Sequence, residues 1–421
     1  MRILFLSHFP LFGNGSGNYT RKLAAELIER GHEVSVVAPN QKPISRALKV
    51  FSFQPAHRAV FQGHSEWPEA VRYQDMTPKQ FTEQYDSFLW AIIHAVQTFK
   101  PDLIHVNHTF FNTWIANYVR SLYGIGFVVT PHGTDILQVT SDRRYYELTR
   151  QALSRAAGIL PVSNHTRKWL FKAFGRGLKA KTRIVPAGLT KEAFIAPRSI
   201  VSLERKYDLI GKKIVIFVGR LTKEKGVEYL IRAAGLIRAE IYLIGSGPAS
   251  EELQLLAKER GCNNVHFLGY FGKEYLAELR QFYVRADVLV LPSVVDESLG
   301  LVVLEAMALG TPVVASKKGG IPLAVKDGQT GFLIRAKSAR AIAIAVNQIL
   351  KQPDLASKLG RNARDLVYER FHWSVNTPLV ERVYQWAVDV TGRLQSRRSV
   401  FDAKTLRREA RELKSRIGYS G

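Results

Sequence analysis

The chain has 421 residues, of which 46% are hydrophobic and 23% are charged, a composition that is ordinary for a globular protein with room for two full-sized hydrophobic cores. Its one cysteine, Cys262, excludes an intramolecular disulfide and a zinc site built from several thiolates. The sequence contains no uncharged apolar stretch close to the roughly 18 residues of a membrane span, so we expect a cytoplasmic protein that does not cross a membrane.

The formal net charge of +24 is concentrated toward the two ends of the chain. Residues 1–187 hold 23 Lys and Arg against 12 Asp and Glu, and residues 391–421 hold 9 against 3. A field of this sign attracts nucleic acid, anionic lipid headgroups or phosphorylated substrates, although a basic surface that is merely solvated fits equally well. Charge by itself therefore does not identify a partner.

Strand-like apolar runs alternate with segments of helical period from the first residue onward, which predicts a parallel sheet flanked by helices. The first unit consists of a strand over residues 2–7, a glycine-rich loop, a helix over about residues 19–30 and a strand over residues 33–38. A further helix is expected to begin at Thr77-Pro78, since proline is tolerated in a first turn. Later strands are expected at Leu103–Val106, Phe127–Thr130, Ile159–Val162 and Arg183–Val185.

The pattern weakens after residue 186 and restarts as a second doubly wound unit, with strands at Ile214–Val218, Ile241–Ile244, Val265–Phe267, Val288–Leu291 and Pro312–Ala315. We therefore predict an α/β protein with one Rossmann-like domain over residues 1–187 and another over residues 188–374, facing each other across a cleft. A helix over residues 375–390 is expected to pack back on the first domain. The basic tail, residues 391–421, is either helical or disordered.

Ligands of such domains bind at the carboxyl ends of the strands, so function is expected in the loops there. The loop Gly219–Gly226 presents Arg220 and Lys225, whose charges suit phosphate oxygens, although ordinary solvated loop cations are the plainer alternative for this loop taken by itself. The loop Gly245–Pro248 follows the next strand. Its glycines allow either the close approach of a nucleotide or a tight strand-to-helix turn.

The strongest signal is the segment 292–312, in which Glu297 and Glu305 stand on either side of a helix start. Glu297 is expected in the loop, and Glu305 about two turns further along a mostly apolar helix. A carboxylate among apolar neighbours needs a partner or a ligand hydroxyl. Hydroxyls of a ribose and of a sugar would meet that need, while an ordinary surface position for Glu305 is the plainer alternative.

The segments Arg220–Gly226 and Glu297–Pro312 resemble the donor-site motifs of the large retaining glycosyltransferase family 4, whose members have the GT-B fold. Further matches, up to about Trp386, are Gly15–Gly17, His132-Gly133, Ser163, Pro186–Gly188 and Gly319-Gly320. Two positions depart from the family pattern. Ser16 separates the two glycines that are often adjacent in the first loop, and Ala187 stands where asparagine is frequent.

The resemblance implies that the first domain binds the acceptor and the second the donor, and it implies roles for individual residues. Arg220 and Lys225 would hold the diphosphate of a nucleotide sugar, Glu305 its ribose and Glu297 the hydroxyls of the donor sugar. His132 would lie beside the anomeric centre or the phosphate. The other donor-binding positions that it implies are Gly17, Gly245, Gly300, Leu301 and Val302.

The implied activity is transfer of a hexosyl unit, with retention, from a UDP- or GDP-sugar to an acceptor hydroxyl. The sequence has no Asp-x-Asp motif, so no metal ion or other cofactor is implied, and the two loop cations would stabilise the leaving diphosphate.

A nucleotide-sugar epimerase of the same fold is an alternative. A nicotinamide-dependent oxidoreductase fits poorly, because Asn18 stands where the third fingerprint glycine belongs, and no motif for specific nucleic-acid binding is present.

Two stretches without acidic residues suggest the kind of acceptor. Residues 167–183 carry seven Lys and Arg among aromatic side chains, and residues 34–65 carry four. Basic segments with apolar side chains are typical of membrane-surface contacts, which predicts a peripheral enzyme acting on a lipid or lipid-linked acceptor at the inner face of the membrane. Inward packing of the apolar side chains, with a small soluble acceptor, is the alternative.

Overall fold

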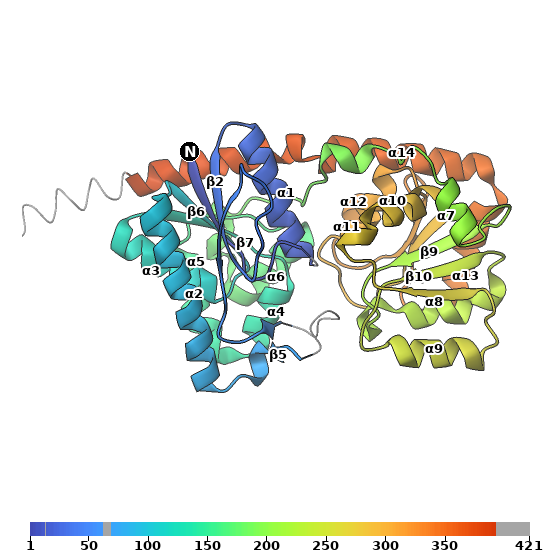
Figure 1. Cartoon of the computed structure of the whole chain (residues 1–421), viewed down its shortest axis with the longest axis horizontal. Helices are drawn as coiled ribbons and strands as arrows, with labels where there is room; N and C mark the ends of the chain where they lie inside the picture. The colour runs from blue at the N-terminus through green and yellow to red at the C-terminus, as the bar shows by residue number, and fades with distance from the viewer. Residues whose placement is uncertain (13, 62–68, 393–421) are drawn as a thin grey trace, which may run out of the picture.

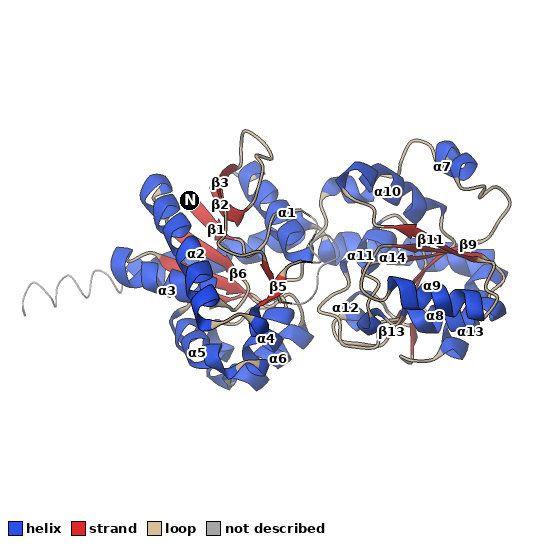
Figure 2. Ribbon diagram, turned by 60° about the horizontal axis from the view of Figure 1, so that its bottom comes forward, coloured by secondary structure: helices blue, strands red, loops and turns tan. Residues whose placement is uncertain are grey.

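The computed structural model describes residues 1–12, 14–61 and 69–392, so the tail from residue 393 onward and Gly13 of the glycine-rich loop lie outside the described residues. The chain forms two domains, each built on a six-stranded sheet (Figure 1). All strand pairs in both sheets are parallel, and helices cover both faces of each sheet (Figure 2). The predicted α/β class is confirmed. No helix in the described ranges is long and apolar enough to span a bilayer.

The sheet of the first domain has the strand order β3-β2-β1-β6-β7-β8. Its strands are β1 Arg2–Leu6, β2 Glu33–Pro39, β3 Lys49–Phe53, β6 Leu103–Asn107, β7 Gly126–Thr130 and β8 Gly158–Ile159. Two short strands, β4 Ala59–Val60 and β5 Val71–Arg72, form a separate parallel pair. Because the order of connection reverses between β1 and β6, the carboxyl ends of these two strands flank a crevice.

The structure differs from the expected strands at two edges of this sheet. Residues 183–185 form no strand, although Arg183 N–H donates to the Ile159 carbonyl (2.9 Å) and Val185 N–H to the Pro161 carbonyl (3.1 Å). The flanking prolines lack the N–H that a longer ladder requires. At the other edge, β3 was not predicted, because most of its side chains are half-buried rather than alternating between core and solvent.

The helices of the first domain are α1 Gly15–Glu29, α2 Pro78–Phe99, α3 Phe111–Tyr123, α4 Thr134–Ser141, α5 Tyr146–Arg155 and α6 Asn164–Phe174. Helix α2 begins where predicted, after a capping box between Thr77 and Gln80. Helix α1 begins four residues earlier than predicted. The Asn14 side chain accepts a hydrogen bond from the Gly17 N–H at 2.7 Å, so Gly15 and Gly17 lie in the first helical turn instead of a loop.

The second sheet repeats the topology of the first, with the order β11-β10-β9-β12-β13-β14. Its strands are β9 Ile214–Val218, β10 Glu240–Ile244, β11 Val265–Gly269, β12 Val288–Leu291, β13 Val313–Ser316 and β14 Phe332–Ile334. The five predicted strands are confirmed, and the edge strand β14 was not predicted. The helices are α7 Val201–Lys206, α8 Val227–Ala233, α9 Ser250–Glu259, α10 Leu276–Arg285, α11 Leu301–Ala308, α12 Ile321–Ala324, α13 Ala339–Lys351 and α14 Pro353–Phe371.

The chain crosses between the domains twice, at neighbouring places. Leu189 N–H donates to the Phe371 carbonyl (2.6 Å), and Trp373 N–H donates to the Leu189 carbonyl (3.0 Å). Gly188 lies against the Trp373 indole, where a Cβ atom would come within 2.6 Å of the ring. The two crossings are therefore hydrogen-bonded to each other and packed around one buried aromatic side chain.

A helix over residues 373–392 follows the second crossing and lies along the first domain (Figure 1). Glu381 forms an ion pair with Arg30 at 2.8 Å, and the buried Tyr384 hydroxyl is hydrogen-bonded to Nδ1 of His105 on β6. The other nitrogen of His105 lies 2.7 Å from the Thr130 hydroxyl. Burial lowers the pKa of His105 to about 3, so this ring is a neutral link between the helix and the sheet.

We expect Tyr384→Phe to lower the free energy of unfolding by about 1–3 kcal/mol, because His105 Nδ1 would stay buried without a partner. Urea unfolding followed by circular dichroism measures this change. The control is Tyr368→Phe, which removes a hydroxyl from a side chain that is 59% exposed. Equal stability of the two variants would contradict a structural role for the His105–Tyr384 contact.

Candidate active site

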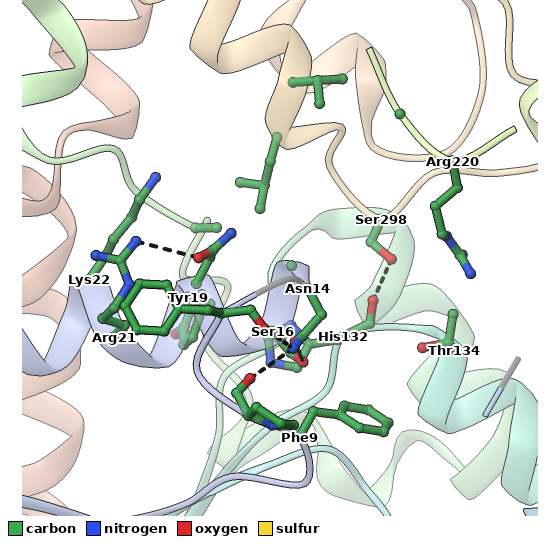
Figure 3. A pocket seen from close by; sticks show the side chains of 18 of the residues that line it. Phe9, Asn14, Ser16, Tyr19, Arg21, Lys22, His132, Thr134, Arg220 and Ser298 are labelled. Carbon is green, nitrogen blue, oxygen red and sulfur yellow. Dashed lines mark hydrogen bonds between the residues drawn. The ribbon is translucent and has the colours of Figure 1, made fainter. Parts of the chain in front are cut away.

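A cleft of about 1280 Å³ lies between the two domains and is lined by residues of both. The strands that meet there are β1, β6 and β7 of the first domain and β9, β10 and β12 of the second, so the cleft lies at the carboxyl ends of both sheets, where the order of each reverses. Figure 3 shows part of its lining, with Arg220 and Ser298 of the second domain opposite His132 and helix α1. Of the residues expected in the site, all but Gly17 line this cleft.

Helix α11 points its amino terminus into the cleft. Gly300, at the cap position, adopts φ 78°, a left-handed conformation that favours glycine, and the strand-to-helix turn thereby brings Leu301 and Val302 to the cleft wall. The first N–H groups of a helix have no intrahelical partner, and neither a capping side chain nor an acidic residue occupies this first turn. The arrangement suits an anionic ligand.

Glu297 lies in the loop before α11 and is only 14% exposed. Its Oε1 accepts hydrogen bonds from Lys225 Nζ at 2.6 Å and from Ser293 Oγ at 2.5 Å. Burial acts to raise the pKa of Glu297, but the charge and hydrogen bond of Lys225, the Ser293 hydroxyl and the charge of Arg220 outweigh it and hold that pKa below its usual value. Glu297 is therefore an ionised acceptor of hydrogen bonds that lines the cleft.

Glu305, in the second turn of α11, also lines the cleft. Its Oε2 accepts a hydrogen bond from the Tyr283 hydroxyl at 3.1 Å, and its Oε1 lies 3.8 Å from Lys22 Nζ on α1. Its side chain is 28% exposed. The carboxylate thus has partners on both sides of the cleft and keeps an accessible face for a ligand.

Glycines in two loops, after β9 and after β13, let the backbone pack closely against the loop that carries Glu297. A Cβ on Gly226, where φ is 65°, would come within 2.3 Å of the Pro292 carbonyl oxygen, and one on Gly319 within 2.1 Å of the Glu297 carbonyl oxygen. Gly320 N–H donates to that same carbonyl at 2.6 Å. The loops after β9 and β13 therefore hold the loop after β12 in place.

The loop after β10 also owes its glycines to protein packing. A Cβ on Gly245 would come within 1.8 Å of the Gly219 carbonyl oxygen, and one on Gly247 within 2.4 Å of the Leu221 carbonyl oxygen. Gly245 lines the cleft nevertheless. The tight strand-to-helix turn, one of the two interpretations from the sequence, thus accounts for the glycines of this loop. The other interpretation, close approach of a nucleotide, is compatible with that turn.

His132 follows β7 and lines the cleft from the first domain. Its ring Nε2 lies 3.0 Å from Asn107 Oδ1. The backbone N–H groups of His132 and Gly133 donate to Asp135 Oδ1 at 3.1 and 2.7 Å. Asp135 is fully buried and also accepts from Thr109, so it fixes the loop that carries the histidine. Burial, then the neighbouring His108 and His105, lower the pKa of His132, which keeps the ring neutral.

The structure places Gly17 differently from the expectation. Gly17 is buried against Pro10 and Leu11, where a Cβ would come within 2.3 Å of the Pro10 carbonyl oxygen. Gly15, two residues earlier at the start of α1, lines the cleft instead, and a Cβ there would lie 3.8 Å from Leu301 of α11. The amino termini of α1 and α11 therefore face each other across the cleft.

Polar contacts between described residues join the domains at the cleft. The Ser298 hydroxyl donates to the His132 carbonyl (Figure 3), Asp296 lies 3.4 Å from Nε2 of His165 on α6, and Lys22 contacts Glu305. Asp296 and Ser298 flank Glu297 in the chain. The loop that carries Glu297 thus lies against the first domain on both sides, with a hydrogen bond at Ser298.

Sequence reasoning missed the residues whose importance depends on the arrangement of the domains. Lys22 and Tyr283 lie on helices whose local pattern is that of ordinary amphipathic surfaces, and no spacing rule connects them to Glu305. Ser293 and Ser298 stood inside the strongest motif, and the hydroxyls beside a carboxylate were a signal that could have been used. Asp135 likewise stood three residues after His132.

Two family models match the chain. Residues 203–366 match the model described as glycosyl transferases group 1, and residues 13–192 match the model described as glycosyltransferase family 4. The alpha-maltose-1-phosphate synthase of Mycolicibacterium smegmatis is 30% identical, with 68% of this chain and 80% of that protein covered. The D-inositol 3-phosphate glycosyltransferase of Corynebacterium jeikeium is 28% identical, with 91% of this chain and 96% of that protein covered.

A solved structure shows the same architecture. HepE of Anabaena, crystallised in complex with UDP and glucose, matches with a TM-score of 0.71 at 21% identity, over 91% of this chain and 100% of that one. The two facing Rossmann-like domains form the GT-B fold, as the motifs had implied.

Proposed function

We propose that this chain, which belongs to the group 1 glycosyltransferases of family 4 and transfers a sugar from a nucleotide sugar, is a retaining, metal-independent hexosyltransferase. The observation that carries the proposal is the ionised Glu297, held at the cleft by Lys225 beside the amino terminus of α11. An acceptor of hydrogen bonds next to an anion-binding helix terminus suits a hexose joined to a diphosphate.

In the proposed donor complex, a UDP- or GDP-hexose lies along the second domain. Its diphosphate meets the first-turn N–H groups of Leu301 and Val302 together with Arg220 and Lys225. Glu305 accepts hydrogen bonds from the ribose, and Glu297 from the hydroxyls of the hexose. The UDP and glucose in the HepE crystal structure support a donor of this class.

The proposed chemistry is stabilisation of the leaving group. The bond between the anomeric carbon and the β-phosphate oxygen breaks with its electron pair on the phosphate, while positive charge develops on the sugar. Arg220, Lys225 and the helix N–H groups oppose the growing negative charge, which is electrostatic catalysis. The acceptor hydroxyl attacks from the face that the phosphate leaves, its proton passes to the leaving phosphate, and the configuration is retained. The neutral His132 lines the same cleft, beside the anomeric centre.

Metal independence forms part of the proposal because, in the proposed donor complex, two protein cations and a helix terminus supply the positive charge that a divalent ion would otherwise bring to a diphosphate. Lys225 already lies within 2.6 Å of Glu297, so a diphosphate there would meet a cation fixed in position. This fixed geometry lowers the reorganisation needed when charge develops.

For the acceptor, we propose a lipid or lipid-linked molecule at a membrane surface. Lys168 and Lys172 of α6 are exposed, as a contact with anionic headgroups requires. The aromatic side chains contribute less than the sequence suggested. Leu170 and Phe174 are buried in the core of the first domain, and Phe53 packs edge-on against Phe88 with ring centroids 4.7 Å apart. The proposed contact is therefore electrostatic rather than insertion of apolar groups.

A small soluble acceptor is the second candidate. The relatives from Corynebacterium jeikeium and Mycolicibacterium smegmatis carry names that include inositol 3-phosphate and maltose-1-phosphate, which are small water-soluble molecules. The inward packing of the aromatic side chains in both basic stretches favours this candidate, because it leaves fewer apolar groups for a bilayer.

We expect Arg220→Ala and Lys225→Ala each to lower kcat on the order of a hundredfold, because each cation faces a charge that grows in the transition state. Assays of donor hydrolysis and transfer in EDTA measure this effect, and EDTA itself should leave the wild-type rate unchanged. Thermal melts of the variants control for folding. Wild-type turnover in both folded variants would refute the diphosphate assignment.

Glu305→Gln should weaken binding of the free nucleoside diphosphate and of the nucleotide sugar alike, since the ribose is common to both. Glu297→Gln should chiefly weaken binding of the nucleotide sugar, because its proposed partner is the hexose. Isothermal titration calorimetry of both variants with UDP and with UDP-glucose separates the two roles. Equal losses for UDP in the two variants would contradict this division.

Cosedimentation with vesicles should rise with the content of anionic lipid and fall with salt. The double variant Lys168→Gln/Lys172→Gln should lower the partition coefficient by about tenfold or more, since each cation near an anionic surface contributes about 1 kcal/mol. The matched control is Lys258→Gln/Lys358→Gln, two exposed lysines of the second domain. Absence of wild-type binding to anionic vesicles at low salt would leave the soluble acceptor as the better proposal.

A further inference from the structure

The two walls of the cleft differ in charge. The carboxylates that line it are Glu192, Glu297 and Glu305, all of which come after the first crossing between the domains. Among the described residues of the first domain, none that lines the cleft is acidic, and helix α1 contributes two adjacent cations, Arg21 and Lys22 (Figure 3). The wall that faces the proposed donor site is therefore positively charged.

Lys22 has a partner on the opposite wall, because its Nζ lies 3.8 Å from Glu305. Arg21 differs from Lys22 in this respect, because in the described part of the chain no carboxylate forms an ion pair with it within 4.0 Å. Its guanidinium lies 4.7 Å above the Phe12 ring centroid, and one Nη atom makes a long hydrogen bond of 3.4 Å to Asn18 Oδ1. The Nε atom is buried and unpartnered.

This environment leaves the charge of Arg21 only partly compensated. Burial lowers the pKa of Arg21, and no carboxylate offsets that effect. The contact with the Phe12 ring offsets only part of the cost of removing a charge from water. Since the guanidinium also lines the cleft, an anion from solution can reach it and supply the missing partner.

We propose that Arg21 binds an anionic group of the acceptor, a phosphate or a carboxylate. The planar guanidinium can bind either group through two parallel hydrogen bonds. The second domain already supplies two cations and a helix terminus for the donor diphosphate, so an anion at α1 of the first domain belongs to the other substrate. The assignment to the acceptor rests on the function proposed above, whereas the anion site itself rests on the environment of Arg21.

The test uses inorganic phosphate as the probe in isothermal titration calorimetry, with the full chain both free and saturated with UDP. Phosphate should bind the UDP-saturated protein, and Arg21→Gln should weaken that binding about ten- to hundredfold, as expected for loss of a charge-assisted hydrogen bond. Arg21→Lys should keep part of the affinity, and UDP binding should be unchanged. The control is Arg205→Gln, an exposed arginine of α7 outside the cleft.

Vesicles of phosphatidylcholine with and without phosphatidic acid distinguish the two sources of the phosphate. Binding that Arg21→Gln weakens only on phosphatidic acid vesicles would assign the site to a lipid phosphate, and an effect on inorganic phosphate alone would assign it to a soluble acceptor.

Loss of UDP affinity in Arg21→Gln would overturn the proposal, because Arg21 would then belong to the donor site. Unchanged phosphate affinity in that variant would overturn it as well. Failure of the wild type to bind UDP or GDP would contradict the proposed function instead, and the titrations of the free protein would still decide the anion site.

Discussion

Glu297 can remain ionised in a largely buried position only because Lys225 and Ser293 donate hydrogen bonds to it, and this requirement determines how the surrounding loops are arranged. Lys225 follows β9 and Glu297 follows β12, which are neighbours in the sheet although 72 residues separate the two side chains. The glycines of the loop after β13 then support the Glu297 carbonyl from a third side. Three connections of the second sheet thus converge on one residue, Glu297, at the place where the strand order reverses.

The first domain takes part in the same arrangement. Asp296 and Ser298 reach His165 and the His132 carbonyl on either side of Glu297, so the position of the carboxylate is not set by the second domain alone. A displacement of the domains would break both contacts at once. For the proposed transfer reaction, this means that the wall carrying the neutral His132 and the wall carrying the donor cations keep their spacing through the loop that would hold the sugar.

Much of the second domain could be predicted, because its central strands are continuous apolar runs. The strand Ile214–Val218 has the same bounds in the sequence interpretation and in the structure. The edge strands β3 and β14 were missed, since half-buried side chains at the edge of a sheet give no clear periodicity. Most site residues of the second domain could be predicted, because they are polar residues that follow strands. The contacts of Lys22 and Ser298 could not, because they depend on how the two domains face each other. Gly17 was misplaced because a helix beginning at Gly15 looks, in sequence, like a flexible loop.

The second crossing of the chain has a consequence for the order in which the protein is made. The first domain leaves the ribosome before the second, yet His105 and Arg30 find their partners on a helix that is synthesised after residue 372. The second domain, between the crossings, is continuous in the chain and can complete its sheet earlier. During synthesis, the surface of the first domain that this helix covers therefore stays exposed until residues 373–392 have been translated.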